Sequence, residues 1–217
     1  MQEIDGRRVR GDASRRLVLE NAVDLASLEG LDGLSIGRLA TAAHVSKSNV
    51  ATLFGTKQRL QLATVESAAQ RFRETVLEPA RQAAPRGIHR IVALLDAWIA
   101  YSRDRVFPGG CFFAAAVADF DSKPGPVRDA IARAYDDWGD YVRVSVGYAI
   151  AQGELAPEAD AEQLAFEFMA LLDTANTRSV MTGSNEPYRF ARRGLVSRLI
   201  AAGADPEVVR PLAEHVD

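Results

Sequence analysis

Apolar residues recur at helical spacing along almost the whole chain. Val, Ile and Thr never gather into alternating runs bounded by turns, whereas Ala, Leu, Arg, Glu and Gln, which favour helices, dominate. In the first predicted helix, Val18, Ala22 and Leu25 lie on one face, and Gly30 follows its last residue. The pattern therefore predicts an all-α fold.

Proline and glycine residues divide the rest of the chain into further helices. The sequence contains no repeat, low-complexity tract or long linker, so we expect two parts that share one compact helical body. The predicted helices cover residues 14–29, 35–42, 46–53, 56–78, 86–104, 110–120, 125–152, 159–181 and 187–202.

Two of these helices are short and are separated by only three residues, Ala43 to Val45. Ser46 is a suitable N-cap for the second short helix, on which Val50 and Phe54 face inward. Two helices joined by so short a turn are typical of a helix-turn-helix. An ordinary helical hairpin with a solvated polar face is the alternative interpretation.

The outward residues of the second short helix have the chemistry of a DNA-reading surface. Lysine donates hydrogen bonds to guanine or to phosphate, and asparagine pairs with adenine. Serine or threonine can form hydrogen bonds with either base. These outward residues are Lys47, Ser48, Asn49 and Thr52.

The charge distribution fits a DNA-contacting face on an otherwise acidic protein. The net charge of the chain is −3, but residues 33–65 carry Arg38, Lys47, Lys57 and Arg59 and no Asp or Glu. A local basic window is the expected footprint of one face that meets phosphate. By itself this asymmetry is weak evidence, because short windows without acidic residues are common.

From Arg16 to about Leu62 the sequence resembles the TetR (tetracycline-repressor-like) family of bacterial transcriptional regulators. The resemblance rests on VLENAVDLASLEGLDGLSIGRLATAAHVSKSNVATLFGTKQRL, which has the family's first helix, its glycine, its helix-turn-helix and the following F-x-x-K-x-x-L. More loosely, residues 108–130, PGGCFFAAAVADFDSKPGPVRDA, look like the ligand-domain signature of one branch of the family.

The resemblance implies a three-helix DNA-binding domain, residues 1–60, and a larger helical domain, residues 61–217, that dimerises and binds a small effector. It implies a ligand-responsive repressor that binds double-stranded palindromic operator DNA as a homodimer and is released by a small effector. The DNA-contacting residues are then expected to be Ser35, Lys47, Ser48, Asn49, Thr52, Thr56 and Lys57.

Three positions depart from the family pattern. His44 stands in the turn where most members have glycine, Ala51 replaces an aromatic residue, and Leu53 replaces a frequent His or Tyr. Because those aromatic residues commonly contact phosphate, the alternative to a repressor is a helical ligand-binding or scaffolding dimer with a weakened DNA-binding head. We expect His44 to be a tolerated left-handed residue rather than a switch.

The sequence offers no recognisable catalytic or metal-binding pattern. His44, His89 and His215 are far apart, and none has a Cys, Asp or Glu at familiar ligand spacing. Nucleophile-elbow, phosphate-loop and dinucleotide-binding motifs do not occur. We therefore expect a protein that is not an enzyme and that needs no metal or cofactor.

We expect the chain to act in a reducing cytoplasm, without contact to a membrane. It has one cysteine, and its longest apolar run, from Cys111 to Ala118, is eight residues, far below the roughly 20 needed to cross a bilayer. Cys111 follows two glycines near a predicted helix start, where a thiol can become reactive, but the neighbouring phenylalanines also suit simple packing.

Aromatic residues are concentrated in the second part of the chain. They suit either a packed core or a mostly apolar effector cavity. We predict a cavity lined by Trp98, Tyr101, Phe112, Phe113, Trp138 and Phe168.

The last two long predicted helices each carry an apolar face, with Gly194 allowing a close approach. Two such faces per subunit suit a symmetric four-helix interface, although they could equally complete the core of one subunit. The predicted interface residues are Leu164, Leu171, Leu172, Ala175, Leu195 and Leu199.

Overall fold

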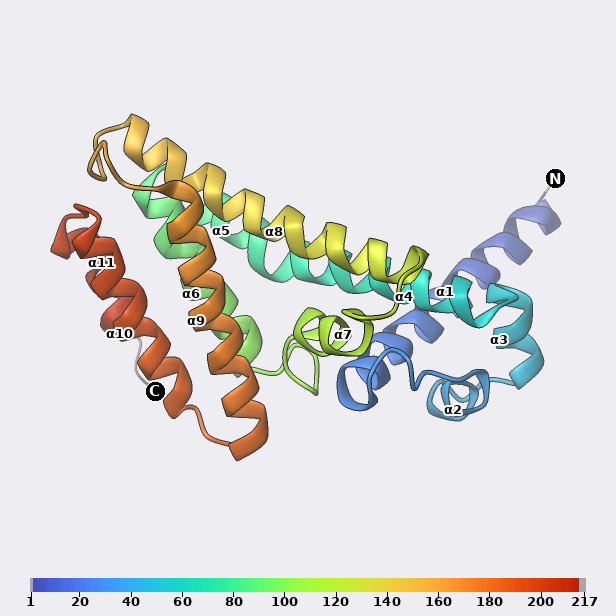
Figure 1. The fold of residues 1–217 in the computed structure, drawn as a ribbon. Helices are drawn as coiled ribbons and strands as arrows, with labels where there is room; N and C mark the ends of the chain where they lie inside the picture. The colour runs from blue at the N-terminus through green and yellow to red at the C-terminus, as the bar shows by residue number, and fades with distance from the viewer. Residues whose placement is uncertain (1, 215–217) are drawn as a thin grey trace. The chain divides into compact units, whose positions relative to one another are not determined.

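The computed structural model of the chain describes residues 2–214, with side chains described for residues 11–213. Within residues 2–214 every regular element is a helix, which confirms the predicted fold class (Figure 1). The helices are α1 Gln2–Glu29, α2 Ile36–Ala42, α3 Lys47–Phe54, α4 Lys57–Phe72, η1 Arg73–Leu77, α5 Glu78–Ala83, α6 Ile88–Arg103, α7 Phe112–Phe120, α8 Pro126–Ala151, α9 Ala161–Thr182, α10 Glu186–Ala201 and α11 Pro206–Glu214.

Contacts between Cα positions divide the chain into two compact units. The first unit comprises residues 1–70 together with residues 107–132, and the second comprises residues 71–106 together with residues 133–217. Helices α4 and α8 each pass from one unit to the other, so the division falls inside helices and could not be seen as a linker in the sequence.

The core of the first unit forms around α1. Val18, Ala22 and Val23 are fully buried, and buried Leu39 of α2 and Val50 of α3 supply further apolar surface. Burying side chains of this size stabilises a fold by about 1.5–3 kcal/mol each. The three N-terminal helices are therefore held by a common apolar core.

Helix α7 packs against α1 in the same unit, although it lies beyond residue 100 in the sequence. The Gly109 backbone N–H donates to Ser27 Oγ at 3.1 Å, and a side chain at Gly109 would overlap the backbone of Ser27. Glycine is therefore required at this close approach. The segment that resembles a ligand-domain signature thus packs on the first helix of the DNA-binding region.

The predicted helix 56–78 continues further than expected. It passes through one π-helical turn, η1, and resumes as α5, with Pro79 in the first turn of α5. A proline inside a continuing helix removes one backbone hydrogen bond, and here the π-helical turn that changes the hydrogen-bond pattern lies just before it. The structure also contains α11, which lies beyond residue 202, where the last predicted helix ends.

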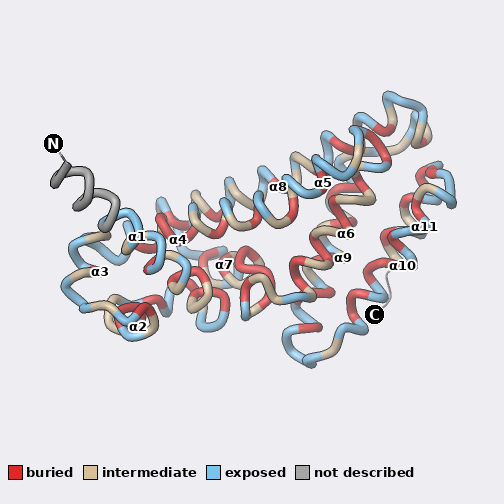
Figure 2. Tube along the Cα trace, turned by 180° about the vertical axis from the view of Figure 1, so that it is seen from behind, coloured by how far each residue is buried: buried red, intermediate tan, exposed pale blue. Residues whose placement is uncertain are grey.

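In the second unit α9 and α10 run side by side, with buried residues on their facing sides and exposed residues outward (Figure 2). A side chain on Gly194 of α10 would meet Leu171 of α9 at 3.1 Å, so this glycine permits close packing within the chain itself. Buried Ser102 of α6 bonds to Asn176 of α9 at 2.9 Å and to Tyr188 of α10 at 2.7 Å. These bonds satisfy polar groups that would otherwise be costly to bury.

None of the helices between residues 2 and 214 is both long enough and apolar enough to span a bilayer.

Candidate nucleic-acid interface and effector region

Helices α2 and α3 form a helix-turn-helix whose ends are all capped. Ser35 accepts a hydrogen bond from the Arg38 N–H at 3.3 Å at the start of α2, and Ser46 accepts one from the Asn49 N–H at 3.1 Å at the start of α3. Such caps stabilise a helix by about 1 kcal/mol each, which matters for helices this short.

The turn between the two helices depends on His44. Its φ is +52°, so it adopts the left-handed conformation that we expected. The N–H of His44 donates to the Thr41 carbonyl at 3.3 Å, and the N–H of Val45 donates to the Ala40 carbonyl at 3.0 Å. This pair of bonds is the Schellman arrangement, in which glycine is most common, so histidine occupies it at some conformational cost.

The inner face of α3 anchors the recognition helix. Val50 and Phe54 are buried, as predicted from their spacing. The guanidinium of Arg15 lies 4.8 Å from the Phe54 ring centre and donates to the Leu53 carbonyl at 3.4 Å. With this face fixed on α1, the orientation of the opposite face is determined.

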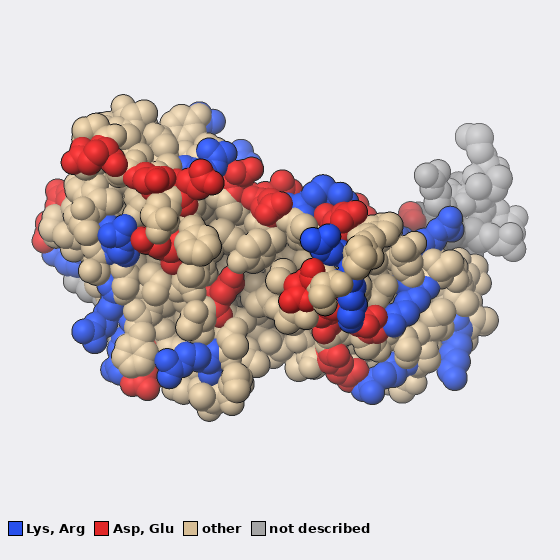
Figure 3. All heavy atoms as spheres, viewed as in Figure 1, with Lys and Arg blue, Asp and Glu red and all other residues tan. Residues whose placement is uncertain are grey.

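Several residues predicted to contact DNA are exposed on or beside α3. Lys47 and Ser48 begin the helix, and Thr52 follows one turn later, its hydroxyl donating to the Ser48 carbonyl at 2.8 Å. Thr56 is exposed and accepts from the Arg59 N–H at 3.2 Å, so it also caps the start of α4. Figure 3 shows basic side chains along the edge formed by α2 and α3, and a mixture of acidic and basic side chains along α8.

Asn49 differs from its neighbours because its side chain points back into the first unit. Its amide Nδ2 donates to Ser14 Oγ of α1 at 3.2 Å, and the residue is only partly exposed. A contact with a base requires this amide to leave Ser14. The sequence could not reveal the bond, because the two residues are 35 positions apart.

Lys57 is also engaged in the free chain. Its ammonium donates to the Asp32 carbonyl at 2.5 Å and lies 3.3 Å from Asp32 Oδ1, and Lys123 approaches the other carboxylate oxygen at 2.8 Å. The hydrogen bonds from Lys123 and then from Lys57 hold the pKa of the Asp32 carboxyl below its usual range. All three side chains remain about half exposed, so the cluster is a surface feature.

The two positions where the family usually has aromatic or histidine residues lie on the outer half of α3. Ala51 is exposed and Leu53 is partly exposed. Neither side chain can donate a hydrogen bond to phosphate.

The six residues predicted to line an effector cavity do not belong to one unit. Phe112 and Phe113 lie in the first unit, where their rings pack edge to face with centres 5.3 Å apart. The other four, Trp98, Tyr101, Trp138 and Phe168, lie buried in the second unit.

In the second unit these rings contribute to an aromatic core around Phe72. The ring centres of Phe72 and Tyr101 are 5.4 Å apart and those of Phe72 and Trp138 are 5.3 Å apart, both edge to face. Trp98 lies 6.1 Å from Tyr101. Such pairs contribute about 0.5–1.5 kcal/mol each beyond burial, so the rings have a packing role in the free chain.

Cys111 is buried, with only 5% of its surface exposed, and it occupies the N-cap position of α7. No group of three or more His, Cys, Asp or Glu suited to a metal occurs in the part of the chain that the structure describes.

The predicted dimer residues mostly lie on the inner sides of α9 and α10. Leu171 is partly exposed, whereas the other five have at most 2% of their surface exposed within the chain's own fold. Those five side chains cannot touch a second subunit without unfolding the first, so the prediction named the buried side of these helices. The buried five are Leu164, Leu172, Ala175, Leu195 and Leu199.

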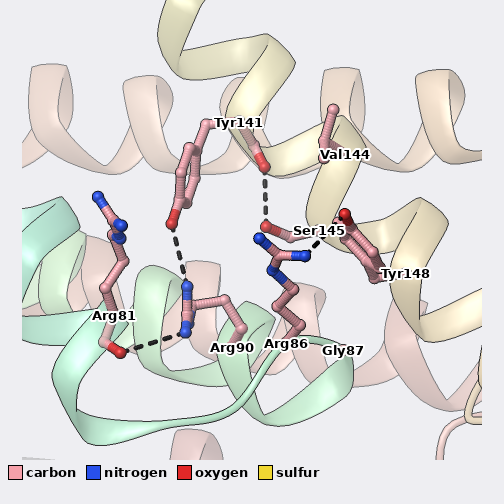
Figure 4. A pocket seen from close by; sticks show the side chains of 8 residues that line it. All are labelled: Arg81, Arg86, Gly87, Arg90, Tyr141, Val144, Ser145 and Tyr148. Atoms are coloured by element: carbon pink, nitrogen blue, oxygen red, sulfur yellow. Dashed lines mark hydrogen bonds between the residues drawn. The ribbon is translucent and has the colours of Figure 1, made fainter.

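Sequence reasoning did not identify a polar pocket in the second unit, with a volume of about 430 Å³ (Figure 4). Arginines from α5, α6 and their connection face tyrosine, serine and valine side chains of α8 across this pocket. In the sequence, the α8 residues of this pocket differ from an ordinary amphipathic helix face in no visible way, because they recur once per helical turn. The lining residues are Arg81, Arg86, Gly87, Arg90, Tyr141, Val144, Ser145 and Tyr148.

Solved structures with the same fold are regulators. The chain matches a TetR transcriptional regulator from Chloroflexus aurantiacus with a TM-score of 0.78 and 24% identity, over 88% of this chain and 94% of that one. A TetR-family regulator from Agrobacterium tumefaciens matches with a TM-score of 0.77 and 18% identity, over 87% and 98% of the two chains.

A third similar structure is that of AibR in complex with isovaleryl coenzyme A and operator DNA. It has a TM-score of 0.63 and 21% identity, and the match covers 76% of this chain and 86% of AibR. Among curated protein sequences, none matches this chain.

A family model described as the tetracyclin repressor-like C-terminal domain matches residues 87–195, which is half of the chain. This match lies entirely outside residues 16–62, on which the closer part of the sequence resemblance rested, and it includes residues 108–130, which carried the looser part. The match and the N-terminal resemblance are therefore independent observations. The chain belongs to the TetR family of transcriptional regulators.

Proposed function

We propose that this chain is a ligand-responsive repressor that binds double-stranded operator DNA through α3. The observation that carries the proposal is the capped helix-turn-helix, whose inner residues are buried while Lys47, Ser48 and Thr52 are exposed on the opposite side. A recognition helix held in this way presents its N-terminal residues to the major groove.

We assign different roles to the residues of this face. Ser35 at the start of α2 and Lys57 at the start of α4 are placed to bind phosphate, which positions a protein without reading sequence. Lys47 and Ser48 are placed to reach base edges, and Asn49 can join them only after it releases Ser14. Thr52 and Thr56 supply further hydroxyl contacts.

The protein is proposed to bind a palindromic operator as a homodimer. The outer sides of α9 and α10 support this proposal, because they carry large apolar side chains that stay exposed: Phe166 at 69%, Met181 at 81% and Phe190 at 46%. These exposed residues replace the buried leucines as the proposed contact surface. Two copies of a helix pair can close with twofold symmetry, which matches a twofold operator.

Response to an effector is proposed from membership of the family. AibR forms a complex with both isovaleryl coenzyme A and operator DNA, which shows that a protein of this fold can bind both kinds of partner. We propose residues 1–60 as the DNA-binding domain and residues 61–217 as the effector-binding and dimerisation domain. Because α7 packs on α1 through Gly109 and Ser27, a change in the α7 segment would be passed to the DNA-binding helices.

A mostly apolar effector among the aromatic rings of the second unit remains a proposal. In the free chain those rings pack on one another, so a ligand would have to displace some of them. Thermal-shift measurements with Trp98→Ala and Phe168→Ala test this location, since neither change would affect a ligand that binds elsewhere.

The alternative function is a ligand-binding or scaffolding dimer with a weak DNA-binding head. Exposed Ala51 favours it, because α3 lacks the usual aromatic contact at that position. The two functions differ in their affinity for selected DNA.

The test is fluorescence anisotropy with a duplex selected by the protein from a random pool. We expect Lys47→Ala to weaken binding about tenfold, as expected for a base or phosphate contact. Arg133→Ala, which removes an exposed cation from α8, is the matched control and should bind like the wild type. Failure to select any duplex would reject the repressor and favour the alternative.

A further inference from the structure

The pocket between α5, α6 and α8 has an unusual charge. Three of its eight lining residues are arginines and none is acidic. Arg81 and Arg86 are exposed and Arg90 is partly buried, so solvent screens much of the repulsion between the three guanidinium groups. An anion in the cavity would be attracted by all three. Figure 4 shows the arginines on one side of the cavity and the two tyrosines on the other.

One of the arginines has a structural role that fixes its position. Arg90 donates to the Ala84 carbonyl through Nε at 3.1 Å, and its Nη2 reaches the Arg81 carbonyl at 3.2 Å. These carbonyls end α5, so Arg90 caps that helix. Its remaining amino group donates to the Tyr141 hydroxyl at 3.1 Å.

Both tyrosine hydroxyls accept a hydrogen bond from an arginine and so keep their own protons available. Tyr141 accepts from Arg90, and Tyr148 accepts from Arg86 at 3.0 Å. A phenol has one O–H donor in addition to its acceptor sites. Each hydroxyl can therefore donate to a ligand, and the arginine beside it orients it for that purpose.

Arg81 is the arginine with the most donors left. Within the described part of the chain its guanidinium makes no hydrogen bond or ion pair, although all five of its N–H groups can donate. Exposed Arg86 uses one amino group on Tyr148. The pocket thus offers many donors, whereas Ser145 is committed to the Tyr141 carbonyl at 2.8 Å.

The carboxylate of Glu154, close to Gly87 of the pocket, does not neutralise the three arginines. Glu154 Oε2 accepts from the Ile88 N–H at 2.8 Å and so caps the start of α6 beside Gly87. One carboxylate so engaged leaves the group of three arginines with an excess of positive charge.

We propose that this pocket binds a small anion with at least two negative charges on phosphate or carboxylate oxygens. Such oxygens accept hydrogen bonds only, which matches a site rich in donors, and arginine binds both groups in a bidentate manner. A volume of about 430 Å³ falls within the range of small-molecule sites. We further assign the anion as the effector, in place of the mostly apolar effector proposed for the aromatic rings. This step rests on the proposed function, because it needs a repressor that responds to a ligand.

Calorimetric titration of the full chain at constant ionic strength tests the binding. Inorganic pyrophosphate and citrate are the two probes, and they separate phosphate from carboxylate as the preferred group. We expect saturable binding of at least one probe and a loss of about tenfold in affinity for Arg81→Gln, since one charge-assisted contact is removed. Arg133→Gln is the matched control and should remain within about twofold, because exposed charges at a distance are screened.

Arg81→Gln is preferred to Arg90→Gln because Arg90 also caps α5, so its loss could unfold the region. Tyr148→Phe is the second variant, and it should weaken binding by removing one donor while leaving the ring in place. If neither probe saturates the site, or if Arg81→Gln binds like Arg133→Gln, the proposal is overturned.

Operator binding, measured separately, distinguishes the two steps of the proposal. The effector assignment predicts that saturating probe changes operator affinity in the wild type and not in Arg81→Gln. Probe binding without any change in operator affinity would leave an oxyanion site and overturn its assignment as the effector site. If Arg81→Gln weakened DNA binding as much as Lys47→Ala while no probe bound, the arginines would serve DNA and the pocket proposal would fail.

Discussion

Replacing Asp32 by asparagine should make the protein bind DNA more tightly. In the free chain Asp32 holds the ammonium of Lys57, with Nζ 3.3 Å from Oδ1. Lys57 must leave this carboxylate before it can bind phosphate. Breaking the ion pair therefore reduces the favourable free energy of DNA binding. Asp32→Asn removes this cost, because the ion pair no longer exists in the free chain.

The structure sets the size of this effect. The Lys57 and Asp32 side chains are 52% and 48% exposed, so theirs is a surface ion pair, worth about 0.2–1 kcal/mol. The expected gain in affinity is about 1.5- to 5-fold at low salt. It should be the same on selected and random DNA, because phosphate contacts do not read sequence, and it should shrink as salt screens the charges.

The pKa of Asp32 defines the pH range of the effect. Lys123 and Lys57 lower this pKa in the folded chain, so the pairs stabilise the fold above the unfolded value of about 3.9 and are lost as pH falls through the lowered value. At neutral pH the pairs are fully formed. Anisotropy titrations at pH 7 therefore measure the full difference.

A double-mutant cycle separates the ion pair from the general removal of negative charge. Asp32→Asn should raise affinity less in a Lys57→Ala background than in the wild type. Lys123→Ala, which leaves the Lys57 pair intact, should not raise affinity. An equal gain with and without Lys57, or no gain at all, would refute the proposed competition between Asp32 and phosphate.

Three further predictions concern single side chains. If Asn49 reads a base, Ser14→Ala should leave operator affinity unchanged or raise it in anisotropy titrations. If Asn49 only holds α3 against α1, Ser14→Ala and Asn49→Ala should weaken operator binding to the same extent. His44→Gly should raise the free energy of unfolding, measured in urea, by about 0.5–1 kcal/mol. Glycine removes the strain of a φ of +52°, although it loses more conformational entropy on folding than histidine does. An unchanged or lower free energy of unfolding would contradict the argument from strain. Burial raises the pKa of the Asp173 carboxyl despite its hydrogen bond from Tyr135. Ionisation of Asp173 therefore lowers the stability of the fold as pH rises from the unfolded pKa of about 3.9 through the raised pKa of the folded state. Asp173→Asn should be more stable than the wild type at pH 7, and this advantage should vanish near pH 3.

The helices and the helix-turn-helix were predictable because they depend on local spacing. Ser35 and Ser46 cap α2 and α3, and the buried positions of α3, Val50 and Phe54, follow from one helical turn. The left-handed conformation of His44 was also predictable, because most members of the family that the sequence resembles have glycine at this position of the turn. The predicted helices did not include α11, which begins at Pro206, where the first helical turn tolerates proline, and which contains Pro211 in its interior.

Long-range contacts could not be predicted from one sequence. An apolar face on α9 indicates that Leu172 is buried, but not whether α10 or a second subunit covers it. The Asn49–Ser14 bond and the Lys57–Asp32 pair join residues whose separation carries no periodic signal. The three arginines of the pocket each look like solvated surface, and only the fold brings them together.

Helix α3 is proposed to bind DNA as part of a symmetric dimer. The most direct measurement is selection of duplexes from a random pool, followed by sedimentation of the protein with the selected duplex. We predict an inverted repeat with half-sites about 10 base pairs apart or a multiple of this distance, bound by two chains, and loss of binding for Lys47→Ala. Selection of no common sequence, or a single chain bound to a site without symmetry, would contradict the account.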